Sequence, residues 1–271
     1  MIRTSILIVL VATVGSSVIP KAQPIVNPSL PIKFERTVVQ QSPVIPSNSA
    51  AGWRYGVDLS VPTTPQKTQC LKQLSYSSAF IRVYNPLGQG SFDINSCNTI
   101  RNAMSADLSI EIYMTPQPVS SKPAYQQVDE LYNGLTNCGI TARRLWIQIT
   151  SPVNWPSAQS PNINFMNSII ARAKKYGMAV GIYTNLYEWS QITGGWNGLG
   201  NDVLLWYWNV YGPGVSGETP ANFNDFRPFG NWRAATVKQF AQTETVCQMT
   251  VNRDIYYTVT AELPKAIEMK L

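Results

Sequence analysis

Gln148 and Thr150 stand two residues apart at the end of an apolar segment, residues 144–151, with the sequence Arg-Leu-Trp-Ile-Gln-Ile-Thr-Ser. In a strand, this alternation places Trp146, Gln148 and Thr150 on one face and three aliphatic residues on the other. At the carboxyl end of a strand in a parallel barrel, the two polar side chains would point together into the barrel mouth. An amide and a hydroxyl form hydrogen bonds but do not titrate near neutral pH, so this pair suits binding better than proton transfer.

Proton transfer in this chain would depend on carboxylates, because the sequence contains no histidine. This excludes Ser-His-Asp and Cys-His triads and histidine-based metal sites. Asp58 lies in the first predicted strand. Glu111 stands two residues before Tyr113 in the third predicted strand, so the two side chains point to the same face. We expect the carboxylates of Asp58 and Glu111 to face one cavity. Two alternatives stay open, since Asp58 could cap a turn and Glu111 could pair with Arg82 or Arg144.

Aromatic side chains near the predicted strand ends are candidates for substrate binding. The chain has 8 Trp and 13 Tyr, which are many for one domain, and aromatic faces can stack on sugar rings. We expect Tyr183 and Trp206, and after them Tyr113, to line a cleft. Most other rings, Trp146 included, are expected to pack in the core. Glu188 follows the fifth predicted strand and is expected to lie exposed in a loop.

The segments that must position these residues alternate between strand and helix. Predicted strands cover residues 55–59, 79–84, 108–113, 144–151, 178–184, 203–207 and 236–240. Predicted helices begin at the Thr64 cap before Pro65, at Asn95 or Ser96, at Ser121, and at a cap formed by Asn162 or Asn164. This alternation predicts an α/β fold with a parallel sheet, and the lack of helices after residue 184 predicts a single irregular (β/α) barrel of the TIM type. A doubly wound open sheet is the alternative, although no Gly-x-Gly-x-x-Gly motif follows the first strand.

The 271-residue chain is long enough for one large domain, which we place at residues 52–262. Residues 1–22 combine a basic start, an apolar run and small residues; they are predicted to be a secretory signal peptide, with an amino-terminal anchor as the alternative. Residues 23–51 are polar and punctuated by proline, which predicts a linker or propeptide. Residues 263–271 are assigned as a C-terminal tail. The protein is therefore expected to be secreted, without a membrane anchor after signal cleavage.

The cysteines and the charge restrict the cofactor and the partners. Cys70, Cys97, Cys138 and Cys247 predict up to two disulfides in a secreted chain, with three possible pairings. Without Cys-x-x-Cys spacing or histidine, we predict no metal and no cofactor. The net charge of +6 is scattered along the chain. It argues against nucleic acid as a partner, and it fits either an anionic surface such as a bacterial wall or a role in solubility.

Several short motifs resemble, in this order, the lysozymes of glycoside hydrolase family 25, in their invertebrate branch. Besides the segment 144–151, they are Gly-Val-Asp-Leu-Ser at 56–60, Gly-Ile-Tyr-Thr-Asn at 181–185, Trp-Ser-Gln-Ile-Thr-Gly-Gly at 189–195, Leu-Trp-Tyr at 205–207, Phe-Gly-Asn-Trp at 229–232, Lys-Gln-Phe at 238–240 and the segment 247–256. The resemblance covers nearly the whole predicted domain. It implies an incomplete (β/α) barrel in which carboxylates hydrolyse bacterial peptidoglycan.

The resemblance also shows where this chain departs from the family. The family has Asp at the position of Gln148, the general-acid Glu at the position of Thr150, and a further Asp at the position of Asn252. Of the expected active-site acids, the resemblance leaves only Asp58. Asp254 falls where the family has Asn.

These departures lead to three functional hypotheses. We expect a monomeric, catalytically impaired protein that binds peptidoglycan or a related glycan. The enzyme alternative is an active muramidase that uses Asp58 with Glu111 or another displaced acid. The third hypothesis is an extracellular protein-binding or signalling module.

Overall fold

A computed structural model describes residues 52–257 and 266–269, which all belong to one unit of the chain. The predicted signal peptide, residues 1–22, and the predicted linker, residues 23–51, lie outside the described residues. None of the described helices has the length and apolar character needed to cross a membrane.

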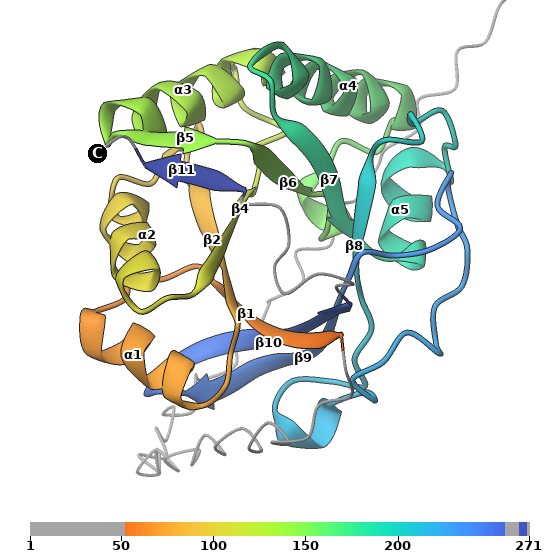
Figure 1. Ribbon diagram of the computed structural model, residues 1–271. Coiled ribbons are helices and arrows are strands. Elements are labelled where there is room, and N and C mark those ends of the chain that lie inside the picture. Colours follow the sequence, from red (N-terminus) through yellow and green to blue (C-terminus); the bar gives the residue numbers. More distant parts are fainter. Residues whose placement is uncertain (1–51, 258–265, 270–271) are drawn as a thin grey trace, which may run out of the picture. The chain divides into compact units, whose positions relative to one another are not determined.

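The core of the fold is a closed β-barrel (Figure 1). In order around the barrel, its strands are β1 (Trp53–Leu59), β2 (Ser78–Asn85), β4 (Ser109–Met114), β6 (Arg144–Gln148), β7 (Ala179–Thr184), β8 (Leu204–Trp208), β9 (Val237–Val246) and β10 (Met249–Tyr257). Neighbours from β1 to β9 are parallel, whereas β10 is antiparallel to both β9 and β1. Because β1 pairs with both β2 and β10, the sheet closes on itself. The predicted barrel is confirmed, and the open-sheet alternative is wrong.

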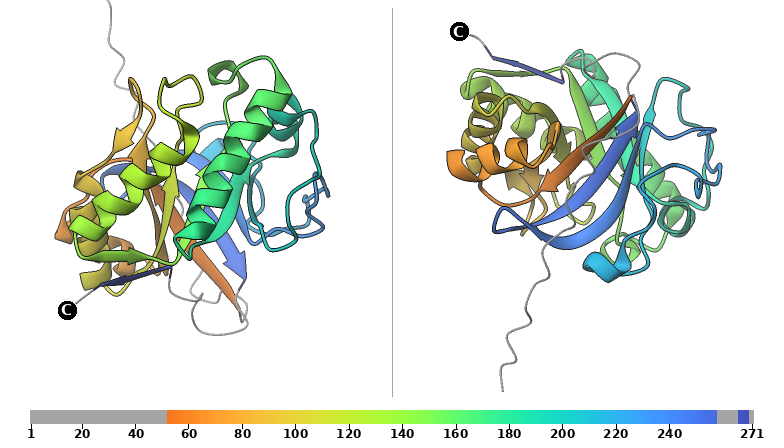
Figure 2. Two further views of the ribbon diagram at one scale, coloured as in Figure 1. Left: turned by 90° about the horizontal axis from the view of Figure 1, so that it is seen from above. Right: turned by 60° about the horizontal axis from the view of Figure 1, so that its bottom comes forward.

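Helices surround the parallel part of the barrel. They are α1 (Pro65–Gln73), α2 (Asn95–Ser105), α3 (Ala124–Asn137), α4 (Gln159–Lys175) and α5 (Leu186–Thr193). Figure 2 shows α3 and α4 side by side on the outside of the barrel. The antiparallel strands β9 and β10 are joined by a tight hairpin instead of a helix.

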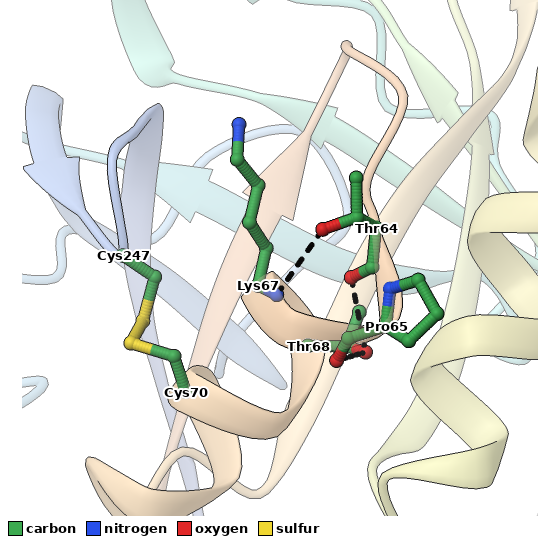
Figure 3. The surroundings of a disulfide bond; sticks show 6 residues. All are labelled: Thr64, Pro65, Lys67, Thr68, Cys70 and Cys247. Carbon is green, nitrogen blue, oxygen red and sulfur yellow. Dashed lines mark hydrogen bonds between the residues drawn. A yellow bond between two sulfur atoms is a disulfide. The ribbon is translucent and has the colours of Figure 1, made fainter.

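The helix starts test the capping predictions. The Thr64 hydroxyl accepts a hydrogen bond from the Lys67 amide at 3.4 Å, so Thr64 caps α1 as predicted (Figure 3). The predicted caps of α4 are wrong, because the helix already begins at Gln159. Asn162 is buried inside α4, and its amide donates to the carbonyls of Pro156 and Ile192.

Short strands complete the described fold. β3 (Ser91–Phe92) pairs with β2, and β5 (Ile140–Ala142) pairs antiparallel with β11 (Ile267–Met269). Single 3₁₀ turns follow β6 and β8, at Pro152–Asn154 and Val215–Gly217. Since β11 lies in the predicted C-terminal tail, this part of the tail is attached to the domain beneath α3 (Figure 1).

Two disulfides settle the open question of cysteine pairing. Cys70–Cys247 joins α1 to the turn between β9 and β10, and Cys97–Cys138 joins α2 to the end of α3 (Figure 3 shows the first). In the β9–β10 turn, Cys247 and Gln248 both have left-handed φ values, 49° and 59°. Hairpin turns of this kind favour Asn-Gly, so the Cys-Gln pair carries some backbone strain next to the disulfide.

Candidate functional site

Side chains that point into the barrel lie in layers. Every second residue of a strand points inward, and the register between strands places the inward side chains of every second strand at the same height. The mouth layer, at the carboxyl ends of the parallel strands, consists of Arg82, Gln148, Trp208 and Asn252. The second layer consists of Asp58, Tyr113, Tyr183 and Gln239. The floor layer consists of Phe80, Trp146, Trp206 and Asp254.

The floor layer closes the barrel beneath the second layer. The ring of Trp206 lies 4.6 Å from that of Phe80 and 5.9 Å from that of Trp146, centroid to centroid. Gly56 and Gly181 make room for this packing, since a Cβ on either glycine would press against Phe80 or Trp146. A ligand that enters from the mouth can therefore contact only the first two layers.

Asp58 is the carboxylate of the second layer, and two amides hold it. Asn252 Nδ2 donates to its two oxygens at 3.0 and 3.2 Å, and Gln239 Nε2 donates to Oδ2. The Tyr183 hydroxyl donates to Gln239 Oε1 at 3.0 Å and so fixes the orientation of that amide. Burial raises the pKa of Asp58 to about 7, although both amides oppose the rise. The turn-capping alternative for Asp58 is wrong, because these partners lie inside the barrel.

Gln148 and Thr150 lie together at the mouth, as their alternation predicts. The Thr115 hydroxyl donates to Gln148 Oε1 at 2.6 Å, and Gln148 Nε2 donates to Thr150 Oγ1 at 3.0 Å. All three side chains are half-buried. This chain of hydrogen bonds contains no group that titrates near neutral pH, so it can bind polar groups of a ligand but cannot protonate them.

Glu111 points into the barrel but lies below the floor layer, two layers from Asp58. Its carboxylate accepts hydrogen bonds from Arg144 Nη1 at 2.6 Å and from Trp146 Nε1 at 2.8 Å. Burial raises the pKa of Glu111 to about 7, against the opposing effect of Arg144. The prediction that Glu111 shares a cavity with Asp58 is therefore wrong, and the alternative that it pairs with Arg144 is confirmed.

Asp254 is a second carboxylate beneath Asp58. It pairs in register with Gly56, two residues before Asp58 on β1. Trp206 Nε1 donates to Asp254 Oδ1 at 2.9 Å, while Oδ2 is buried without a hydrogen-bond partner among the described residues. Burial, followed by the negative charge of Asp58, raises the pKa of Asp254 well above its ordinary value, while the hydrogen bond from Trp206 opposes the rise. Nowhere in the described ranges do three or more acidic or cysteine side chains form a group that could hold a metal.

The aromatic residues predicted to bind substrate are all buried. Trp206 is 0 % exposed; Tyr183 stacks on it at 4.2 Å between centroids, and Tyr113 meets its edge at 5.8 Å. The prediction that Trp206 lines an open cleft is wrong, because its faces are covered inside the barrel. Tyr183 and Tyr113 lie in the second layer but are nearly covered as well. Trp208, two residues further along β8, is half-buried in the mouth layer, and the same alternation could have identified it.

Comparison with known proteins places this barrel in a family. A family model described as lysozyme-like protein 1 matches residues 49–240. The chain is 58% identical over 248 residues to lysozyme-like protein 7 of Caenorhabditis elegans, covering 92% of this chain and 87% of that protein. It is 33% identical over 202 residues to probable GH family 25 lysozyme 2 of Dictyostelium discoideum, covering 74% of this chain and 90% of that protein. The chain belongs to the lysozyme-like proteins of glycoside hydrolase family 25.

Solved structures share the fold of this family 25 member. The bacterial lysozyme from Streptomyces coelicolor matches with a TM-score of 0.57 and 21% identity, over 79% of this chain and 95% of that chain. At this identity the likeness concerns the barrel alone. The chemistry of the mouth must therefore be argued from the side chains of this family member itself.

Glu188 is a buried carboxylate at the rim of this family 25 barrel, and the prediction that it is exposed is wrong. It lies in α5 and is 7 % exposed. Its oxygens accept hydrogen bonds from the Ser151 amide and from Trp208 Nε1, both at 2.7 Å. Burial raises the pKa of Glu188, while these two donors oppose the rise. Because both oxygens are engaged, Glu188 ties the segment after β6 to the mouth layer.

Replacing Asp58 with Asn is expected to flatten the pH dependence of stability between about pH 4 and pH 7. The carboxyl titrates near 3.8 in the unfolded chain and near 7 in the folded protein, so stability falls as the pH rises through this window. The substitution should raise the free energy of unfolding at pH 8 by about 2 kcal/mol, allowing for one weakened hydrogen bond, and change it little below pH 4. Denaturant unfolding at pH 4, 6 and 8 measures the effect. Asp107→Asn, on an exposed residue, is the control and should show no such gain; a loss of stability at pH 8 in Asp58→Asn would contradict the assignment.

Proposed function

We propose that this family 25 member is a secreted protein that binds peptidoglycan or a related glycan in the barrel mouth and hydrolyses it poorly or not at all. One observation carries the proposal: the mouth and second layers contain a single carboxylate, Asp58, and two amides hold it. By resemblance, Gln148, Thr150 and Asn252 stand where the family has acids.

Hydrolysis of a glycosidic bond needs a proton donor for the leaving oxygen and a second carboxylate at the reacting carbon. General acid–base catalysis typically contributes about 10²- to 10⁴-fold to the rate. Of the other buried carboxylates among the described residues, Glu244 pairs with Arg253, and the remaining three are badly placed for either role. Asp254 lies in the floor layer, Glu111 lies below it, and both oxygens of Glu188 already accept hydrogen bonds. Within the described part of the chain, Asp58 therefore has no second carboxylate beside it that a sugar in the mouth could contact.

The same mouth is well equipped for binding. Gln148, Thr150 and Asn252 are half-buried amide and hydroxyl groups, which suit the hydroxyls and N-acetyl amides of a glycan. Trp208 adds a half-buried indole at the rim, and aromatic rings of this kind contact the apolar faces of sugars. The mouth therefore keeps side chains that can bind the polar groups of a glycan, although the acids that the family has at these positions are absent.

Secretion is part of the proposal. It is supported by the basic and apolar start of the sequence and by the two disulfides, since disulfides form and persist in oxidising compartments. Expression with the native amino terminus, followed by sequencing of the secreted product, tests it; a product that keeps Met1 and remains in the cell would contradict secretion.

An active muramidase is the second candidate, and the raised pKa of Asp58 favours it. A carboxyl with a pKa of about 7 is partly protonated at neutral pH and can act as an acid. This candidate still requires a partner carboxylate, which the nominated Glu111 does not provide. An assay of the unmodified protein separates the two candidates.

The test measures retention and hydrolysis on the same material. The unmodified protein should sediment with insoluble peptidoglycan yet clear a bacterial wall suspension far more slowly than an active family 25 lysozyme assayed beside it. Gln148→Leu should weaken retention several-fold, because it removes an amide from the mouth. Clearance at the rate of the active lysozyme would refute the impairment. Absence of retention would refute glycan binding and favour a protein partner.

A further inference from the structure

A cavity of about 550 Å³ lies beside the barrel mouth, between the start of α5, the end of β8 and the loop that leads to β9. In Figure 1, α5 and β8 lie next to each other at the right of the barrel. The lining includes Tyr187 from α5, Phe226 and Arg227 from the loop, and Trp208. Because Trp208 also belongs to the mouth layer, the cavity continues the mouth outward. Its volume is in the range of ordinary small-molecule sites.

The carboxylate that lines this cavity, Asp225, is already used as an acceptor. Asp225 accepts hydrogen bonds from the Tyr207 hydroxyl at 2.7 Å, from Asn209 Nδ2 at 2.6 Å and from Lys238 Nζ at 2.7 Å. Lys238 also neutralises the charge of Asp225. Asn185 Oδ1 accepts from the Glu188 amide at 2.7 Å. A ligand would therefore find few acceptors here.

The donor groups, in contrast, are available. Arg227 is exposed and makes no hydrogen bond or ion pair within the part of the chain that the structure describes. Asn185 Nδ2 and the Ser190 hydroxyl likewise have no hydrogen-bond partner among the described residues. With Asp225 neutralised, the cavity presents one unpaired positive charge and several donors, so it selects a ligand rich in carbonyl and carboxylate oxygens.

Apolar surface forms the rest of the cavity. Tyr187 is 67 % exposed and Leu186 is 49 % exposed, and Phe226 packs against Tyr207 with centroids 5.2 Å apart. Such a wall suits small apolar side chains or the face of a ring. A peptide with short side chains and free carboxylates combines the two kinds of surface that this cavity offers.

We propose that this cavity binds the carboxylate-bearing peptide attached to a peptidoglycan strand while the strand itself occupies the mouth, with Arg227 pairing with the peptide carboxylate. The inference rests on the proposed function. It adds that the protein recognises the peptide of peptidoglycan as well as the glycan strand. Trp208 lies between the two subsites and contacts both. The cavity therefore makes the protein prefer peptide-substituted strands over bare glycan.

The experiment compares retention on intact peptidoglycan and on the same strands after an amidase has removed the peptides. The unmodified protein should bind the intact material more tightly, and added salt should reduce this preference. Arg227→Gln should weaken binding to intact peptidoglycan by about three- to tenfold and leave binding to peptide-free strands unchanged. Tyr187→Ala, at an exposed position, should act in the same direction. Arg233→Gln is the control, because Arg233 is exposed in the same loop but does not line the cavity.

The outcomes separate this inference from the proposed function. Equal retention of the unmodified protein on both materials, or an Arg227→Gln variant that binds intact peptidoglycan like the unmodified protein, overturns the peptide site and leaves glycan binding in place. A protein retained by neither material overturns both. Loss of binding to peptide-free strands in Arg227→Gln would place Arg227 on the glycan instead and would also overturn the peptide site.

Discussion

Restoring carboxyls at the mouth through Gln148→Asp, Thr150→Glu and Asn252→Asp is expected to raise wall-lysing activity by about 10²- to 10⁴-fold. Thr150→Glu supplies the proton donor, and the two Asp residues supply negative charge near the reacting carbon. An Asp at position 252 would stand against Asp58, since Asn252 Nδ2 now lies 3.0 Å from Asp58 Oδ1. Repulsion between the two carboxylates should keep a proton on one of them at neutral pH.

The measurement is the clearance rate of a bacterial wall suspension across pH 4–8. The control is Gln148→Asn with Thr150→Gln, which makes comparable changes in side-chain size at the mouth without adding carboxyls, and it should remain as slow as the unmodified protein. A triple variant that folds and binds peptidoglycan but clears walls no faster would contradict this prediction. The geometry of the mouth, and not the missing acids, would then limit hydrolysis.

Removing the disulfide between α1 and the β9–β10 turn, with Cys70→Ser and Cys247→Ser, is expected to cause the largest loss of stability. The bond joins residues separated by 177 positions. The chain-entropy model gives a loss of about 5 kcal/mol for a loop of that length. For a domain of this size, such a loss lowers the melting temperature by roughly 10–20 °C. Thermal and denaturant unfolding followed by circular dichroism measure it.

The matched control is the other disulfide, removed with Cys97→Ser and Cys138→Ser. It spans 41 positions, and the same model gives a loss of about 4 kcal/mol. The first pair also holds the strained turn at Cys247 and Gln248, so its removal should additionally increase hydrogen exchange in β9 and β10. A larger loss from the second pair, or unchanged exchange in the hairpin, would contradict this account.

Much of the fold could be predicted because its strands and helices carry local signals. The strand at residues 144–151 alternates along its length, and the α1 start has a threonine cap followed by proline. The β9–β10 hairpin could not be predicted in this way, because its turn uses Cys-Gln instead of the usual Asn-Gly. α5 has only eight residues and a mixed sequence, so its helical period was too short to recognise.

The site could be predicted only where one strand determines the geometry. The adjacency of Gln148 and Thr150 follows from alternation within β6. The partners of Asp58, in contrast, come from positions 181 and 194 residues away, and no local pattern points to Gln239. The depth of Glu111 depends on the stagger between neighbouring strands, because two residues with equal parity can lie on opposite sides of the floor layer. Parity alone shows which way a side chain points and not how deep it lies.

The position of two tryptophans on β8 gives the molecule internal optical probes. Trp206 is sealed against Asp254, whereas Trp208 stands at the rim, bonded to Glu188. Indole emission depends on the polarity and charge around the ring, so proton loss deep in the barrel should alter the light from Trp206. A ligand that binds at the barrel mouth should alter the fluorescence of Trp208. The difference in emission between the unmodified protein and a variant with phenylalanine at position 206 or 208 would isolate the contribution of that indole from those of the other tryptophans, without any added dye.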